Sequence, residues 1–234
     1  LLDDLSTYQF YQVRNGDRPD IVSNLIYGTP DYYWTFFIVN DTLKTGLTGW
    51  SMSSEQFDQY MAENYNGTVI ETRPTVIRNG DGLVIDYRDS LAGRFNTVGE
   101  LVVGQLSGAT GKVVSKDVQM SQLVLGEVTG TFQINEAIVG QESSDQVSSY
   151  RVWDWKEAPH HYEDGEGREL YNAIHINELA GTGVDPGHAD SEVKMVCNLS
   201  YETELNEERA NIRVVRPELI ADFARTFESV LNNA

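Results

Sequence analysis

The chain has a single cysteine, Cys197, which excludes an internal disulfide framework and a cysteine-based zinc site. Its neighbours Val196 and Leu199 suggest that this thiol is a small buried apolar group. No apolar run approaches roughly 18 residues, so no segment is predicted to cross a membrane. Residues 1–6 lack a basic stretch followed by an apolar one, so we expect no signal peptide.

Basic residues are also scarce. The sequence holds 17 Lys and Arg against 36 Asp and Glu, which gives a formal net charge of −19. Nucleic acids and anionic membranes require a cationic surface, so neither is expected as a partner. An acidic surface has two interpretations: it keeps the chain soluble, or it complements a partner with a basic surface.

Motifs for catalysis are missing as well. The sequence contains no Gly-x-Ser-x-Gly elbow, no His-Glu-x-x-His and no kinase signature, so we predict no enzyme and no cofactor. His160 and His161 stand beside Glu163 and Asp164, but adjacent histidines on an extended chain point in opposite directions. We therefore expect a docking loop there and no metal.

The two remaining histidines give little indication of a metal site. His188 lies in a Gly- and Pro-containing loop at 185–190, where a lone histidine between two aspartates is weak support for a metal. His175 falls in an alternating run at 173–176 and is predicted to lie on a strand.

The N-terminal 41 residues contain the densest structural signals. Tyr11 and Val13 alternate with polar neighbours as on a half-buried strand, and 15–17 form a turn. Asp17 is expected to cap a helix that has Pro19 in its first turn and ends at Gly28. A second helix is expected at 32–39, capped by Asp31 and ended by Asn40-Asp41, with a return strand later in the chain.

Further along, a helix is predicted at 53–65 and β-rich runs at 68–73 and 76–87, and the second run contains a hairpin turn at 79–82. From 95 to 147 a glycine-containing β pattern repeats: Glu100-Leu-Val-Val-Gly104-Gln-Leu-Ser recurs as Glu136-Ala-Ile-Val-Gly140-Gln-Glu-Ser. Two such copies can bury their faces against each other. The chain ends in a predicted helix at 200–209, a short strand at 211–215 and an amphipathic helix.

The opening segment resembles the LysM domain, a βααβ unit whose motif positions here are Tyr11, Val13, Gly16, Asp17 and Asn40. The segment from Tyr27-Gly28 through Tyr32-x-Trp34 to Gly49-Trp50 resembles, more specifically, the small baseplate wedge subunit of contractile-tailed phages. The C-terminal region is similar to the end of the same family, at Tyr201, Glu202, Asn206, Glu207, Ile212, Val214 and Val215.

The resemblance implies a non-enzymatic structural subunit of the virion. It would join neighbouring wedges into a ring of six around the tail hub, after assembly in the host cytoplasm. Its partners would be other wedge subunits and neighbouring copies of the wedge. Aromatic side chains dominate protein interfaces, so we predict an interface among the following residues. They are Tyr32, Tyr33, Trp34, Phe36, Phe37, Trp50, Phe223 and Phe227. Packing of these residues inside the chain is the alternative.

A second functional hypothesis is a LysM-type module that binds peptidoglycan or chitin. LysM domains usually carry Thr-Leu after the Gly-Asp turn, where this chain has Arg18-Pro19. A third is a hydrolase using the region of His160 and His161.

The predicted fold class is α+β: a LysM-like βααβ unit, a β-rich repeat insert, and a C-terminal strand plus amphipathic helix. The predicted parts are residues 1–66, the LysM-like region with its following helix; 67–93, a hairpin connector; 94–147, an all-β insert; and 148–234, a β and loop region ending in helices.

Overall fold

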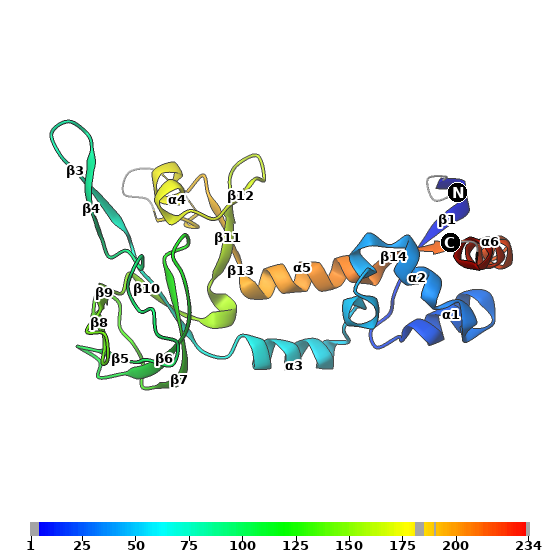
Figure 1. Ribbon diagram of the computed structural model, residues 1–234, viewed down its shortest axis with the longest axis horizontal. Helices are drawn as coiled ribbons and strands as arrows, with labels where there is room; N and C mark the ends of the chain where they lie inside the picture. Colours follow the sequence, from blue (N-terminus) through cyan, green and yellow to red (C-terminus); the bar gives the residue numbers. More distant parts are fainter. Residues whose placement is uncertain (1–4, 181–184, 190, 233–234) are drawn as a thin grey trace. The chain divides into compact units, whose positions relative to one another are not determined.

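The computed structural model describes residues 5–180, 185–189 and 191–232. It contains both helices and antiparallel sheets, which confirms the α+β class (Figure 1). The chain divides into two compact units. Unit 1 combines residues 1–60 with 202–234, and unit 2 comprises residues 61–201.

Unit 1 is built around a two-stranded antiparallel sheet whose strands come from opposite ends of the chain. β1 (Tyr8–Gln12) pairs with β14 (Asn211–Val215), with Tyr11 opposite Ile212. β14 is therefore the return strand that the sequence predicts. The helical elements of this unit follow in chain order. They are η1 (Leu5–Thr7), α1 (Pro19–Tyr27), η2 (Pro30–Tyr32), α2 (Trp34–Val39), η3 (Asp41–Leu43), η4 (Gly46–Gly49), α3 (Ser54–Asn64), α5 (Asn198–Ala210) and α6 (Ile220–Asn232).

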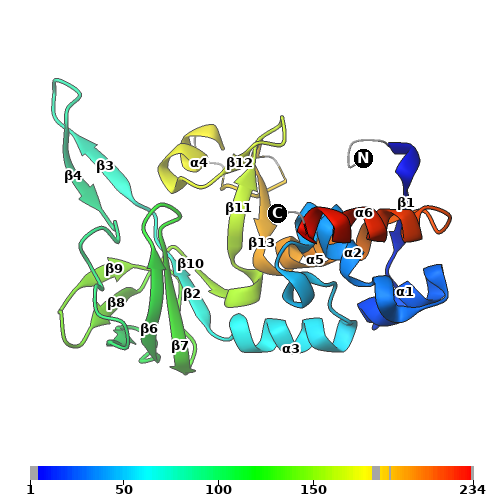
Figure 2. The ribbon, with the colours of Figure 1, turned by 45° about the vertical axis from the view of Figure 1, so that its right-hand side comes forward.

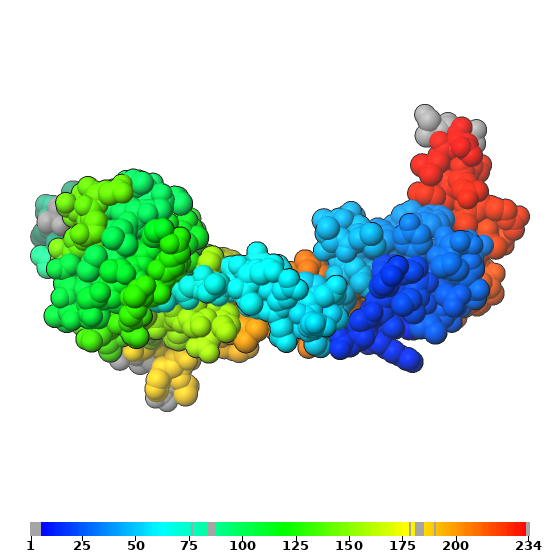
Figure 3. Space-filling model, turned by 90° about the horizontal axis from the view of Figure 1, so that it is seen from below, coloured from blue at the N-terminus to red at the C-terminus, as the bar shows by residue number. Residues whose placement is uncertain are grey.

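The unit boundaries fall inside α3 and α5. The core of unit 1 lies between the sheet and helices α1 and α2. Its buried members are Val13, Val22, Phe36, Leu43, Trp50, Ala210, Ile212 and Val214. The far end of α6 extends beyond the rest of this unit in the space-filling view (Figure 3), and Val230 and Leu231 are exposed there.

Unit 2 contains a seven-stranded antiparallel sheet with the order β10-β2-β7-β6-β5-β8-β9. Its strands are β2 (Thr68–Glu71), β5 (Leu101–Gly104), β6 (Thr110–Asp117), β7 (Gln122–Thr129), β8 (Ala137–Gly140), β9 (Gln146–Ser148) and β10 (Arg151–Asp154).

Two smaller sheets complete unit 2 (Figure 2). One is the hairpin of β3 (Thr75–Arg78) and β4 (Val84–Arg88), which confirms the turn predicted at 79–82. The other has the order β12-β11-β13. Its strands, with the remaining helices, are β11 (Pro159–Glu163), β12 (Glu169–Leu170), β13 (Lys194–Cys197), η5 (Trp155–Glu157) and α4 (Ala173–Leu179).

This grouping differs from the predicted four-part division. β2 belongs to the predicted connector 67–93, yet it lies between β10 and β7, with Val69 opposite both Trp153 and Val124. A strand in the middle of a sheet satisfies its backbone groups on both sides. The predicted insert 94–147 therefore shares one sheet with the segments on either side of it.

The repeated halves of this region fold against each other reciprocally. The buried carboxylate of Glu136 accepts the Leu106 and Ser107 N–H groups at 3.0 and 2.9 Å, in the turn of the other copy. The buried carboxylate of Glu100 accepts the Ser143 N–H at 2.8 Å in the same way. Each half thus caps the turn of the other half.

Candidate interface surface

The LysM-like motif lies where β1 leads into α1. The Val13 N–H donates to the Ala210 carbonyl at 2.8 Å, and the Asp17 N–H donates to the Arg14 carbonyl at 3.0 Å to close the turn. Gly16 has φ of 81°, a left-handed conformation that glycine adopts without strain. The Gly-Asp pair of the motif therefore forms the turn between β1 and α1.

The predicted cap of α1 is wrong. The capping position belongs to Arg18, whose side chain makes no capping bond, and Asp17 lies one residue too early. Arg18 precedes Pro19, and a residue before proline favours extended backbone, here φ −84° and ψ 155°. The helix therefore begins at Pro19, and Gly28 ends it in the left-handed conformation that was predicted.

The predicted single helix at 32–39 is two elements, η2 and α2. Pro30 opens the first turn because its fixed φ suits a helix start. Its cap is Thr29, whose Oγ1 accepts the Asp31 N–H at 3.3 Å, so Asp31 is inside the turn and does not cap a helix.

Two of the predicted interface aromatics belong to the core of unit 1. Phe36 is fully buried, with ring centroids 6.1 Å from Tyr27 and 5.9 Å from Trp50. Trp50 is buried as well, and its indole N–H donates to the Asp17 carbonyl at 2.8 Å. Because both side chains are buried, neither is available to contact another protein, and this corrects their prediction as interface residues.

The other candidates are partly or mainly accessible. Trp34 packs on Phe227 of α6 with ring centroids 5.1 Å apart, and both are half-buried. Tyr32, Phe37 and Phe223 are half-buried too. Tyr33 is the most exposed of the set, with 41% of its surface accessible.

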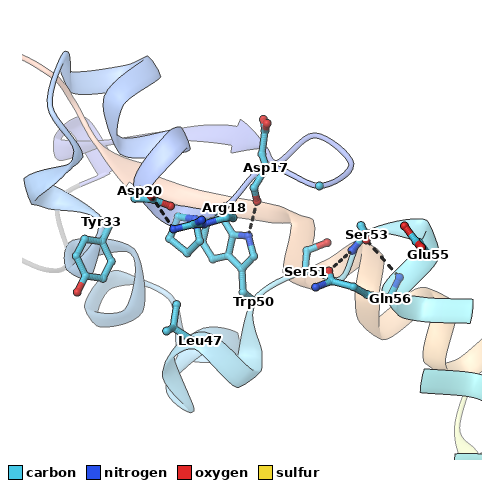
Figure 4. Close-up of a pocket in the computed structure, with 12 residues that line it drawn as sticks. Asp17, Arg18, Asp20, Tyr33, Leu47, Trp50, Ser51, Ser53, Glu55 and Gln56 are labelled. Carbon is cyan, nitrogen blue, oxygen red and sulfur yellow. Dashed lines mark hydrogen bonds and ion pairs between the residues drawn. The ribbon is translucent and has the colours of Figure 1, made fainter. Parts of the chain in front are cut away.

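Tyr33 stands at the rim of an open pocket with a volume of about 710 Å³, all within unit 1 (Figure 4). Leu47 lies on the same rim and is 68% exposed. The lining residues come from the Gly-Asp turn, α2, η4 and the start of α3. They are Gly16, Asp17, Arg18, Pro19, Asp20, Tyr33, Leu47, Trp50, Ser51, Ser53, Glu55 and Gln56.

Local hydrogen bonds fix the walls of this pocket. The Ser53 N–H donates to Gln56 Oε1 at 3.0 Å and the Gln56 N–H donates to Ser53 Oγ at 3.3 Å, a reciprocal capping box at the start of α3. Arg18 forms an exposed ion pair with Asp20 at 3.0 Å. Asp17, Asp20 and Glu55 outnumber Arg18, so the lining is acidic.

Leu47 is the residue that sequence reasoning missed. It lies in Thr45-Gly-Leu-Thr-Gly49, an otherwise polar and glycine-rich stretch that does not favour a helix or a strand. A single large apolar residue isolated in such a loop was the available signal.

The histidine pair of unit 2 does not behave as predicted. The Nδ1 atoms of His160 and His161 lie 2.9 Å apart, so the two rings converge. The register of β11 shifts between Pro159 and His161, and such a bulge redirects a side chain that would otherwise alternate. His160 also stacks on Tyr201 with ring centroids 3.7 Å apart.

The described residues contain no group of three or more His, Cys, Asp or Glu that could hold a metal ion. In the loop predicted at 185–190, Asp185 accepts a hydrogen bond from the Tyr150 hydroxyl and lies 3.5 Å from Arg151. The hydrogen bond from Tyr150 and the charge of Arg151 lower the pKa of the exposed Asp185 carboxyl. Asp190 lies outside the described residues.

Two further predictions are corrected. His175 lies on helix α4, whose start is capped by the Asn172 side chain, so the segment does not form the predicted strand. Cys197 is only half-buried, and its Sγ lies 3.2 Å from Ser200 Oγ at the junction of β13 and α5. A strand end beside a helix start leaves the thiol partly accessible.

The comparison with known families concerns the region that holds the pocket. A family model described as base plate wedge protein 53 matches residues 3–73. Residues 3–73 are therefore similar to a phage baseplate wedge family. The predicted resemblance of the N-terminal region to the wedge family is thereby confirmed, and the match supports a structural role in a phage tail baseplate. The curated proteins contain no match to this chain. Within the described part of the chain, no helix is long and apolar enough to cross a membrane.

Proposed function

We propose that this chain joins neighbouring wedges during assembly of the baseplate around the tail hub, and that the pocket surface of unit 1 makes the contact. The observation that carries the proposal is the position of Tyr33 and Leu47. Both are exposed on the rim of an open pocket inside the region that matches the wedge family. We expect no catalytic activity, and other wedge subunits and neighbouring wedge copies are the proposed partners.

The physical support comes from the aromatic chemistry of this surface. Tyrosine combines a large apolar area with a polar hydroxyl, and few conformations are lost when it is immobilised at an interface. Tyr33 is held against Phe37 with ring centroids 6.4 Å apart, and Phe37 in turn contacts Trp50 at 6.0 Å. An exposed aromatic ring that rests on a buried aromatic core is a rigid anchor for a partner.

Tyr33→Ala tests the proposal, with Tyr171→Ala as its matched control. The two tyrosines are 41% and 40% exposed, but Tyr171 lies in unit 2, away from the family match. Tyr33→Ala should leave the thermal unfolding of the isolated protein almost unchanged and reduce its incorporation into tails by at least about tenfold. Tyr171→Ala should be incorporated normally. Equal incorporation of both variants would place the contact elsewhere.

Glycan binding by the LysM-like region is the competing function. Arg18 and Pro19 line the pocket where LysM domains usually carry Thr-Leu, so we propose protein contacts in place of glycan contacts. Chitin oligomers and peptidoglycan fragments should be titrated against the purified protein by calorimetry. Saturable binding at micromolar concentration that Tyr33→Ala abolishes would favour the glycan function.

A further inference from the structure

The pocket that carries Tyr33 and Leu47 on its rim has a smaller neighbour. The second pocket has a volume of about 400 Å³ and also lies within unit 1, and Ser51 lines both. The start of α3 contributes to each, with Glu55 in the wall of the first pocket and Asp58 in the wall of the second. The two cavities, called the paired pockets below, therefore border the same helix start.

The charged side chains in the walls of the paired pockets are almost all acidic. They are Asp17, Asp20 and Glu55 in the first pocket and Asp58 and Glu207 in the second, against Arg18 alone. Five carboxylates and one guanidinium give these walls a net charge of −4. Arg18 pairs with Asp20 at 3.0 Å, and the exposed Arg14 lines neither pocket. The acidity is thus a local property of this surface.

Most of these carboxylates have no cationic partner within the part of the chain that the structure describes. Glu55, Asp58 and Glu207 are exposed and form no ion pair there. The Oδ2 atom of Asp17 is buried and accepts no hydrogen bond. A buried acceptor without a donor costs free energy, and a donor from another molecule would remove that cost. The walls therefore favour a ligand that has N–H groups and positive charge.

The first pocket also offers apolar surface beside its carboxylates. Tyr33 and Leu47 are exposed on its rim, and Trp50 lies in its wall (Figure 4). Lys and Arg side chains suit such a mixed site, because the aliphatic stem packs on apolar groups while the charged head reaches polar ones. The face of an exposed tyrosine ring attracts a cation as well. Both the charge and the apolar rim thus match a basic side chain of a protein.

We propose that the paired pockets receive a segment of another wedge subunit that presents a Lys or Arg side chain next to an apolar one. The cationic head lies among the wall carboxylates, and the apolar neighbour packs on Tyr33 and Leu47. This inference rests on the proposed wedge-joining function, because it assigns the chemistry of the partner at the surface where that contact is proposed.

A second copy of this chain is a poorer occupant than a different protein. Two copies each carry a net charge of −19, and like charges oppose their association. Three exposed basic side chains of unit 1 are, in addition, already paired with aspartates of the same chain. They are Arg18, Lys44 and Arg225. A different protein with an unpaired basic side chain therefore fits the paired pockets better.

Charge reversal provides the first test. The double variant Glu55→Lys/Glu207→Lys changes one carboxylate in each pocket, and Glu208→Lys/Glu228→Lys is its control. All four glutamates are exposed, and the two variants change the net charge equally, but Glu208 and Glu228 line neither pocket. Both variants should unfold thermally close to the unsubstituted protein. Incorporation into baseplates should fall by about tenfold or more for the pocket variant alone. Equal incorporation of the two variants would overturn the proposal.

Salt dependence provides a second test that a purely structural role of these residues would not affect. Contacts between opposite charges weaken as salt screens them. Co-purification of the unsubstituted protein with wedge subunits should therefore decline as sodium chloride is raised. Glu55→Gln/Glu207→Gln should co-purify less at low salt and show a smaller decline. An unchanged salt dependence in this variant would contradict a cationic occupant.

A photo-crosslinking amino acid at position 47 identifies the occupant. The expected product in assembled tails is a peptide of a different protein with Lys or Arg beside the crosslinked residue. A crosslink to a second copy of this chain, or to a peptide without Lys or Arg, would overturn the proposal. The wedge-joining function would fail separately, if the unmodified protein were missing from baseplates. Loss of incorporation in Tyr33→Ala with normal incorporation of Glu55→Lys/Glu207→Lys would retain that function and reject a basic occupant.

Discussion

Asn40 and Arg213 form a two-way hydrogen-bonded pair across 173 positions of sequence. The same Asn40 amide also donates to the Phe36 carbonyl at 2.8 Å, at the end of α2. One buried side chain thus links the end of the second helix to the return strand. Asn206 makes a similar link, because its side chain bonds both the N–H and the carbonyl of Met52 at 2.8 and 3.1 Å.

Asn40→Ala should destabilise unit 1 by about 2 kcal/mol, because the Arg213 N–H and carbonyl would lose their partners in a largely buried site. Urea unfolding followed by far-UV circular dichroism measures this change. Asn24→Ala is the matched control, since Asn24 is exposed on α1 and its loss should change stability by less than about 0.5 kcal/mol. Equal effects of the two substitutions would contradict a special role for Asn40.

Glu136→Gln should destabilise unit 2 by about 2 kcal/mol. A buried carboxylate that accepts several N–H groups is replaced by an amide, which places a donor against those donors. Thermal unfolding measures the effect, and Glu142→Gln serves as the control because that side chain is exposed. A stability loss in Glu142→Gln as large as that in Glu136→Gln would contradict the reciprocal capping.

The Glu136 carboxylate also makes the stability of unit 2 depend on pH in the acidic range. Burial alone would raise the pKa of Glu136. The hydrogen bonds that its carboxylate accepts from the Gln133 and Ser107 N–H groups have a larger effect in the opposite direction, so the pKa is lowered overall. A lowered pKa in the folded state gives stability that is present above the ordinary carboxyl pKa and is lost as the pH falls through the lowered value. Glu136→Gln should reduce this acid dependence, measured as the free energy of unfolding between neutral and acidic pH.

Unit 1 should lose stability in alkali through Tyr27. Burial raises the pKa of this phenol to about 12, although its hydroxyl donates to the Val215 carbonyl at 2.9 Å. A raised pKa means that the contribution is complete below the ordinary value near 10 and falls as the pH rises toward 12. Hydrogen exchange of peptides from α1 should accelerate over that range. Tyr27→Phe should be less stable at neutral pH but show a smaller alkaline loss, and an unchanged alkaline profile would contradict this assignment.

The sequence predicted those parts of the fold whose signals are local. Gly28 ends α1, and the turn at 79–82 joins β3 to β4, because glycine and asparagine determine backbone geometry within a few residues. The Glu100 and Glu136 copies were recognised as a repeat, but the exchange of caps between them was not, since it depends on packing in space.

Pairing between strands that are distant in the sequence could not be predicted. A β-rich stretch does not indicate which strands become its neighbours, so the place of β2 between β10 and β7 could not be read from residues 68–71. The convergence of His160 and His161 depends on a bulge, which breaks the alternation that the prediction assumed. The burial of Phe36 and Trp50 likewise follows from the joining of the two chain ends in one core.

Replacing residues 94–147 with a short Gly-Ser linker should unfold the large sheet of unit 2. The sequence alone predicts an all-β insert here, but β7 lies inside it and pairs with β2 from Thr68↔Leu125 to Glu71↔Gln122. Removal would leave only β2 and β10 of seven strands, and an isolated two-stranded sheet is marginal in water. Far-UV circular dichroism should lose most of its strand signal, while exchange protection of α1, α2 and β14 should persist, because unit 1 has a core of its own. Full retention of protection in β2 and β10 would show instead that residues 94–147 form an independent unit.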